Sequence, residues 1–144
     1  MKGYRKGSHT VYRLHFHLVF IPKYRKPVFR GEVGKRLREL IIGICNSKDI
    51  EIISGHIRPD HVHMLISAPP SLAPSRIVQA IKGKTSHQLL QDFRTLRKEF
   101  WGGHFWGSGY FIATSGNVTD EVLEDYIKNQ DVEPQNEEVF KVTE

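Results

Sequence analysis

The sequence predicts an α+β sandwich, and three observations lead to that fold class. The chain has 144 residues with 39% hydrophobic content, which suits one compact domain with a single core. Stretches in which apolar residues alternate, as in strands, are interspersed with stretches in which they recur at helical spacing. Their order is strand, helix, strand, strand, helix, strand, helix. Two βαβ-type crossovers around an antiparallel pair describe a ferredoxin-like (RRM-like) sandwich with an antiparallel sheet and an added C-terminal helix.

The first strand is predicted over residues 10–20, because the even positions of this stretch are all apolar. These positions are Tyr12, Leu14, Phe16, Leu18 and Phe20. The odd side carries His15 and His17, so these histidines should lie on the face of the sheet that the core does not use. Pro22 closes the strand.

Helical spacing of apolar residues from Val33 to Cys45 predicts the first helix. Residues 50–57 and 61–67 are then predicted as two strands around the turn Arg58-Pro59-Asp60. The second of these strands alternates, with Val62, Met64 and Ile66 on its apolar side. The opposite side should therefore present its polar residues on the open face of the sheet.

The second half of the chain is predicted to return to the sheet once and to end in a helix. Pro74 can open a helix at its first turn, and Gly83 is expected to bend or end it before a further helical piece that includes Phe93. Residues 110–114 form the last predicted strand, and residues 119–130 the last predicted helix.

Residues 1–130 are predicted to form a single domain, and residues 131–144 an acidic tail that is expected to be disordered. Cys45 is the only cysteine, which excludes an intramolecular disulfide and a cysteine-rich zinc site and suits a reducing cytoplasm. No stretch approaches membrane-spanning length, and no uninterrupted apolar segment follows the basic N-terminus. A soluble, cytoplasmic protein without a membrane partner is expected.

The first thirty residues contain many cations and no acidic residue, in a chain of formal net charge +5. This asymmetry favours nucleic acid as the partner. The cluster Lys23-Tyr24-Arg25-Lys26 places an aromatic ring among cations, so the ring can stack on an unpaired base while its neighbours hold phosphates. A run of charges is more often a solvated face, but the lack of any acid over this length argues against that interpretation here.

Two histidines separated by one residue, His61 and His63, lie on the same side of their predicted strand. Side chains at positions i and i+2 are about 6–7 Å apart at the backbone, so two rings can converge on one divalent ion. A pair of polar rings on the wetter face of a sheet is the more ordinary interpretation, and His15 and His17 have the same spacing. The spacing alone therefore does not establish a metal site.

Two further segments are candidates for contact with nucleic acid. Gly83-Lys84-Thr85 has the appearance of the end of a phosphate-binding loop, but Val78 stands where the first glycine is required, so no nucleotide cofactor is predicted. Lys84 remains a candidate contact to DNA phosphate. Residues 100–106 contain aromatic side chains that could stack on bases, although a glycine-rich connection anchored by core aromatics explains them equally well.

Tyr126 and Gln130 lie one turn apart on one stripe of the last predicted helix. On its own, this tyrosine is explained as an amphipathic core residue with its hydroxyl at the surface. Together with Asp60-His61-Val62-His63 and the early stretch 17–26, however, the pair resembles the small single-tyrosine transposases of the insertion sequence 200/605 family. These belong to the HUH nucleases, named for histidine-hydrophobic-histidine. The resemblance runs from about residue 9 to residue 130.

The resemblance implies a transposase that cleaves and rejoins single-stranded DNA at the ends of insertion elements. His61, His63 and Gln130 would bind a divalent ion, Mg²⁺ or Mn²⁺, and Tyr126 would be the nucleophile that forms a 5′-phosphotyrosine linkage. The chemistry agrees, because a phosphodiester needs charge neutralisation, which a metal ion supplies. A phenol with a pKa of about 10 also needs help to lose its proton at neutral pH. Asp60 could orient a ligand histidine by accepting a hydrogen bond.

The same resemblance implies the partners. DNA hairpins near element ends are the expected ligand, with contacts from His17 and residues 23–26. Family members are dimers, so a homodimer is expected in which the tyrosine helix completes the partner's site, with Gly116 as the hinge. Two alternatives stay open. One is a non-catalytic RRM-like nucleic-acid-binding module, whose aromatic signature is absent here, and the other is a replication- or relaxase-type HUH nickase, which is usually a larger chain.

Overall fold

The computed structural model describes residues 3–114 and 120–129, and its elements follow the predicted order. The strands are β1 (Arg5–Lys6), β2 (Val11–Tyr12), β3 (His15–Phe20), β4 (Glu51–Arg58), β5 (His61–Ser67) and β6 (Phe111–Thr114). The helices are η1 (Lys23–Arg25), α1 (Gly31–Ser47), α2 (Pro74–Asp92), α3 (Arg94–Glu99) and α4 (Asp120–Lys128).

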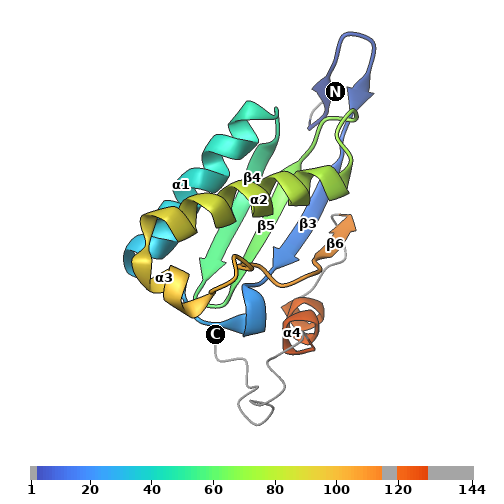
Figure 1. Ribbon diagram of the computed structural model, residues 1–144. Helices are drawn as coiled ribbons and strands as arrows, with labels where there is room; N and C mark the ends of the chain where they lie inside the picture. The colour runs from blue at the N-terminus through green and yellow to red at the C-terminus, as the bar shows by residue number, and fades with distance from the viewer. Residues whose placement is uncertain (1–2, 115–119, 130–144) are drawn as a thin grey trace.

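Four strands form one sheet in the order β4-β5-β3-β6, while β1 and β2 form a separate hairpin (Figure 1). Every neighbouring pair in the larger sheet is antiparallel. Because β5 lies between β3 and β4, and β3 lies between β5 and β6, each crossover through a helix skips one strand. This arrangement confirms the predicted ferredoxin-like sandwich.

The core lies between the sheet and the layer formed by α1 and α2 (Figure 1). It is built from the apolar side of each strand, as the alternation predicts, and from one stripe of each helix. Its most buried members include Leu18, Phe20, Val62, Met64 and Ile66 from the strands and Leu37, Ile41, Ile77, Ile81 and Leu89 from the helices. Cys45 is buried among them, as predicted. This face of the sheet therefore packs against the helices, and the opposite face is available for a functional site.

Two predicted boundaries are wrong. The strand expected over residues 10–20 is divided, since the chain pairs with β1 at Val11–Tyr12 and joins the main sheet only from His15. Gly83 neither bends nor ends α2, which continues to Asp92. A glycine inside a helix costs about 1 kcal/mol relative to alanine, which is too little to end a helix that packs along a core. The separate helical piece, α3, begins after Phe93 instead.

The connection from α3 to β6 is anchored by aromatic residues, as one of the two interpretations proposed. Phe100, Phe105 and Trp106 are buried, and the ring centroids of Phe100 and Phe105 are 4.7 Å apart. Trp106 Nε1 donates a hydrogen bond of 2.9 Å to Thr85 Oγ1, so Thr85 is a buried helix residue rather than a phosphate ligand. Trp101 differs from these neighbours, because its side chain is 85% exposed.

The β1–β2 hairpin projects from the end of the sheet opposite α4 (Figure 1). Arg5 fastens it to the sheet through ion pairs with Asp49 (2.8 Å) and Glu51 (3.3 Å) and a hydrogen bond to the Ser67 carbonyl oxygen (3.1 Å). No helix in the described part of the chain is long and apolar enough to cross a membrane.

Candidate active site

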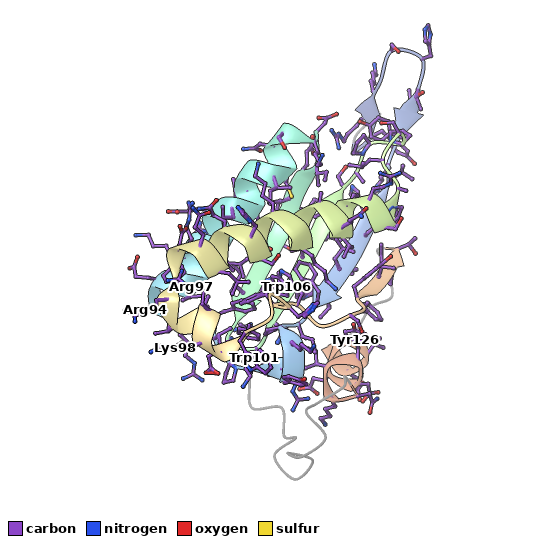
Figure 2. The ribbon with its side chains drawn as sticks, viewed as in Figure 1. Arg94, Arg97, Lys98, Trp101, Trp106 and Tyr126 are labelled. Carbon is purple, nitrogen blue, oxygen red and sulfur yellow. The ribbon has the colours of Figure 1, made fainter. Side chains whose placement is uncertain are left out.

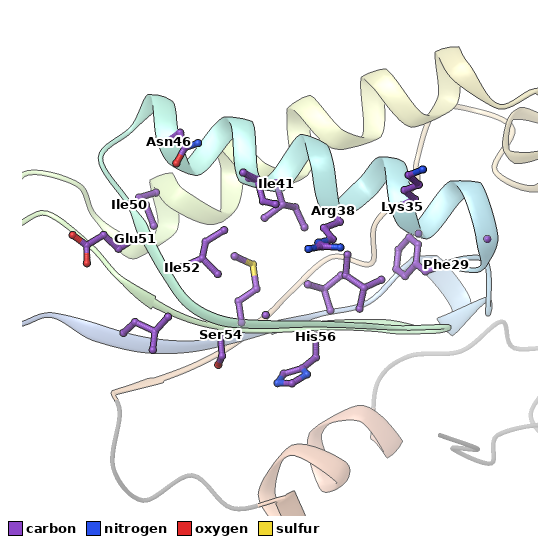
Figure 3. A pocket seen from close by; sticks show the side chains of 18 residues that line it. Phe29, Lys35, Arg38, Ile41, Asn46, Ile50, Glu51, Ile52, Ser54 and His56 are labelled. Carbon is purple, nitrogen blue, oxygen red and sulfur yellow. The ribbon is translucent and has the colours of Figure 1, made fainter.

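Three histidines gather on the face of the sheet that α1 and α2 leave open. His17 lies in β3, His56 in β4 and His63 in β5. The ring centroid of His63 is 5.4 Å from that of His17 and 5.9 Å from that of His56. His17 Nδ1 and His63 Nε2 share a hydrogen bond of 3.1 Å. Figure 3 shows His56 pointing away from α1, toward the side on which α4 lies. Adjacent strands thus bring imidazoles together at one place.

His61 has a more enclosed position at the start of β5, where its side chain is oriented by Asp60. Both residues are buried, and His61 Nδ1 donates a hydrogen bond of 2.9 Å to Asp60 Oδ1. An ionised carboxylate only accepts, so the proton of this hydrogen bond lies on Nδ1, and Nε2 is the ring nitrogen available to bind a metal ion. The contact predicted for Asp60 is present, and it leaves Nε2 in the form that binds metal ions.

Arg25 connects the Asp60–His61 pair to helix α4. Its side chain is buried, Nη1 donates a hydrogen bond of 2.9 Å to the Ile127 carbonyl oxygen, and Nε is 3.9 Å from Asp60 Oδ2. Tyr24 (φ 61°) and Arg25 (φ 55°) both adopt left-handed backbone angles, and the Arg25 side chain turns inward while Tyr24 stays exposed. Each such residue costs about 1–3 kcal/mol. The geometry gives Arg25 contacts inside the molecule, and the DNA contact expected of it stays a prediction.

Helix α4 packs on the same open face and carries Tyr126. Ile127 is buried against Val19, the β3 residue that pairs with His63, and the Tyr126 ring lies 5.4 Å from the ring of Phe111 in β6. Burial raises the pKa of Tyr126 to about 12. The hydroxyl therefore stays protonated at neutral pH unless a neighbouring group or ion helps to remove its proton.

The donor chemistry of the open face fits the predicted divalent ion in part. His61 and His63 offer ring nitrogens from the same side of β5, and Asp60 orients one of them. Over residues 3–114 and 120–129, no three His, Cys, Asp or Glu side chains form a group that could hold a metal ion. Within the described residues, the two histidines would therefore provide only part of a metal coordination shell. Gln130, the predicted third ligand, lies outside the described residues, as do the predicted hinge Gly116 and the predicted tail 131–144.

The predicted DNA contacts are distributed over several elements. Lys23 and Tyr24 lie in η1 and Lys26 follows it directly, and all three line a surface pocket. His17 belongs to the histidine cluster on the open face. Lys84 is exposed on α2, in the helical layer and apart from the histidines. His17 therefore lies within the candidate site, and the η1 residues adjoin Arg25, which reaches Asp60 and α4, whereas Lys84 lies apart from both.

A surface pocket on the helical side of the sheet lies away from the histidine cluster. It has a volume of about 1120 Å³ and lies between α1 and the edge strand β4, where apolar side chains such as Ile41 and Ile52 line it (Figure 3). His56 contributes to its wall, but the imidazole points to the other face of the sheet (Figure 3). The candidate active site is therefore located by the arrangement of its side chains rather than by the volume of a cavity.

His56 was not among the predicted site residues, although the turn of the hairpin allows its place opposite His63 to be predicted. With Pro59 and Asp60 as the two turn residues, Arg58 pairs with His61, and the same register places His56 directly opposite His63. An irregularity in the pairing between Ile52 and Ser54 interrupts the alternation of β4. The alternation along β4 therefore does not predict on which face of the sheet His56 lies. The hairpin register, counted back from the turn, predicts that it lies on the same face as His63.

The fold of this chain is shared with transposases, enzymes that cleave DNA and transfer its strands. Within that class, the chain belongs to the IS200-like transposase family, whose family model matches residues 10–130. The family supports a transposase over both alternatives, the non-catalytic RRM-like module and the replication- or relaxase-type nickase.

Individual relatives cover most of the chain. The ISDra2 transposase TnpA of Deinococcus radiodurans is 35% identical over 126 residues, which cover 88% of this chain and 90% of the relative. The IS200 transposase of Salmonella typhimurium is 34% identical over 123 residues, covering 85% and 80%. A crystal structure of a Deinococcus radiodurans R1 protein assigned as a transposase superposes with a TM-score of 0.82 and 31% identity, covering 90% and 99%.

A more distant structure shares the fold. It is a REP-associated tyrosine transposase bound to a REP hairpin, with a TM-score of 0.56, 17% identity and coverage of 85% of this chain and 71% of that one.

Proposed function

We propose that this transposase cleaves and rejoins single-stranded DNA at the ends of an insertion element through a 5′-phosphotyrosine intermediate. The observation that supports it most directly is the shared face: the histidines of β5 and the Tyr126 helix lie on the same side of the sheet, joined through Arg25. Membership of the IS200-like transposase family implies DNA cleavage and strand transfer. The geometry supports the assignment of His61, His63 and Tyr126 to this chemistry.

In the proposed step, the Tyr126 oxygen attacks the scissile phosphorus and the bond from phosphorus to the 3′ oxygen breaks. The phenol gives up its proton and the leaving oxygen takes up a proton, so a 3′-hydroxyl and a tyrosyl phosphodiester result. A divalent ion held by His61, His63 and Gln130 would supply neutralisation of the phosphate charge. Because the phosphodiester bond is retained in the linkage, a 3′-hydroxyl of a second strand can reverse the step without a nucleotide cofactor.

The proposed DNA ligand is an unpaired strand beside a hairpin. Lys23 and Lys26 offer cations and Tyr24 a half-exposed ring, a combination that suits single strands better than a duplex groove. The distant structural neighbour holds a REP hairpin, which is consistent with hairpin ends on this fold.

The test is the capture of a covalent adduct. Wild-type protein incubated with single-stranded element ends and Mg²⁺ or Mn²⁺ should give a DNA–protein band that resists denaturation. Tyr126→Phe should retain the fold and DNA binding but give no adduct, because only the attacking oxygen is lost. His63→Ala should also abolish the adduct, whereas the matched control His15→Ala should not. Full adduct formation by Tyr126→Phe would refute the assignment of the nucleophile.

A further inference from the structure

Trp101 carries an exposed indole on a turn whose neighbouring residues are anchored. Its predecessor Phe100 is buried against Phe105, and its two successors, Gly102 (φ 91°) and Gly103 (φ 81°), turn the chain sharply through the left-handed region. The Gly103 amide donates a hydrogen bond of 3.3 Å to the Phe100 carbonyl oxygen and closes this turn. Because the Trp101 ring is 85% exposed, packing in the core does not account for its position. Contact with a ligand is an alternative explanation.

The ring borders a pocket whose lining suits a polyanion with flat, apolar parts. The Trp101 pocket, of about 790 Å³, is lined by Lys23, Tyr24, Lys26, Lys98, Trp101 and His104, among others. Two aromatic faces thus share a cavity with three lysines. One acid, Glu99, also lines the pocket, and it pairs with Lys26 at 3.3 Å. The surplus of cations favours phosphate over an apolar protein surface.

The pocket adjoins the candidate active site through η1. Lys23, Tyr24 and Lys26 line the pocket, while Arg25, between them in sequence, reaches inward to Asp60 and to the carbonyl oxygen of Ile127 in α4. Figure 2 shows Lys98 and Trp101 at the same end of the molecule as Tyr126. The two left-handed residues of η1 make this division between inward and outward side chains possible.

We propose that the Trp101 pocket is a stacking site for an unpaired base of single-stranded DNA. The base lies on the indole, Tyr24 forms a second aromatic wall, and Lys23 and Lys98 hold the neighbouring phosphates. Because every base has a π-face, stacking of this kind retains a strand without reading its sequence. The inference rests on the proposed function in one respect, namely that the bound strand is the one that continues to Tyr126.

The test measures equilibrium binding of a labelled oligothymidine, which forms no hairpin, in a Tyr126→Phe background. Loss of the indole in Trp101→Ala should weaken affinity about 5- to 150-fold, equivalent to about 1–3 kcal/mol for one stacked base. Trp101→Phe should keep most of the affinity because it keeps a ring. Tyr4→Ala is the matched control, since Tyr4 is an exposed aromatic residue (48%) beside the hairpin at the opposite end of the molecule, and it should bind as the parent does.

Two further readouts separate stacking from a general loss of structure. Oligothymidine should quench the fluorescence of Trp101 in the parent protein, and Trp101→Phe should lose that quenching, because the other tryptophan, Trp106, is buried. Trp101→Ala should leave the slope of log affinity against log salt unchanged, whereas Lys98→Ala should reduce it by about 0.7, the value for one phosphate contact on a single strand.

Unchanged affinity in Trp101→Ala, or the absence of quenching in the parent, would overturn the proposal. A change in the sedimentation of Trp101→Ala with unchanged DNA affinity would also overturn it, by assigning the ring to a contact between copies of the chain. Because the Tyr126→Phe background cannot use the proposed nucleophile, the outcome is independent of whether the covalent step is correct.

Discussion

At His61, a single hydrogen bond determines which ring nitrogen can bind a metal ion. Asp60→Asn retains the size of the side chain but replaces a carboxylate with an amide, which weakens the bond to Nδ1 and reduces the basicity of Nε2. We expect the affinity for Mn²⁺ to fall about 10- to 100-fold, as measured by isothermal titration calorimetry in the absence of DNA.

The control for this substitution is Asp49→Asn. Asp49 also lies in an ion pair with an arginine, Arg5, but it is exposed near the β1–β2 hairpin, far from the histidines. Its removal should leave Mn²⁺ binding unchanged. If Asp60→Asn binds Mn²⁺ as tightly as the parent, Asp60 does not prepare His61 for a metal ion.

The orientation of some side chains could be predicted from the sequence, and that of others could not. The burial of Cys45 follows from its place on an apolar helical stripe. The position of His63 on the open face of the sheet follows from the alternation along β5. The internal contacts of Arg25 do not follow, because its position in a basic cluster predicts a cation that contacts DNA. The left-handed backbone at Tyr24 and Arg25 accompanies the inward orientation of its side chain. Non-local contacts of this kind leave no periodic signal in the sequence.

Among the elements, α4 is the one whose placement matters most for the proposed chemistry, and Arg25 restrains it. Arg25→Lys keeps the positive charge but loses the planar fork that reaches the Ile127 carbonyl oxygen and Asp60 together. A hydrogen bond from a charged group contributes about 1.5–3 kcal/mol, so the amides of α4 should exchange with solvent about 10- to 100-fold faster in native-state hydrogen exchange.

Arg36→Lys supplies the comparison for Arg25→Lys. Arg36 also forms an ion pair, with Asp92 at 2.9 Å, but the pair is on the surface of the helical layer. Its substitution should leave exchange in α4 unaltered. Equal exchange rates for α4 in Arg25→Lys and in the parent would mean that other contacts hold the helix.

The continuity of α2 through Gly83 leads to a prediction about stability. A Cβ atom at Gly83 would meet no other atom within 4 Å, and the residue has ordinary helical angles. Gly83→Ala should therefore raise the free energy of unfolding by about 0.5–1 kcal/mol, since alanine reduces the entropy of the unfolded chain. Denaturant unfolding measures this change.

Gly34→Ala in α1 provides the contrast to Gly83→Ala. A Cβ atom there would lie 3.2 Å from the Phe29 carbonyl oxygen, so the same substitution should bring less stabilisation or a loss. A destabilised Gly83→Ala protein would indicate that the bend expected from the sequence has a function in α2 after all.

Element order and strand faces are predictable here because alternation and helical spacing are local patterns. The division of residues 10–20 into β2 and β3 is not, because it depends on pairing with β1, a two-residue strand without a pattern of its own. The hairpin register, in contrast, was available from the turn residues Pro59 and Asp60 and would have located His56.

For the whole molecule, the expected homodimer with composite sites remains a prediction. Consider a purified heterodimer of one Tyr126→Phe chain and one His63→Ala chain. If each tyrosine helix serves the partner's histidines, one of the two centres is intact, and cleavage should reach about half of the wild-type level. In the arrangement described here, α4 packs on its own sheet through Val19 and Ile127.

Complete inactivity of that heterodimer, with its composition verified by mass spectrometry, would show that cleavage uses the tyrosine and histidines of one chain. The two homodimeric variants are the controls, and both should be inactive. Chain exchange is excluded if mixing the two homodimers without refolding gives no activity.

The sheet order has a consequence for the timing of synthesis. Strand β3 is an inner strand, yet both of its partners, β5 and β6, are translated after it. In a growing chain, one edge of β3 lacks its partner until Ser67 has been made and the other until Thr114 has been made, which is a period of exposure to aggregation. The proposed nucleophile, Tyr126, is translated later still. All strands of the described residues thus precede Tyr126 in the chain, so the described sheet can be complete before the proposed nucleophile has left the ribosome.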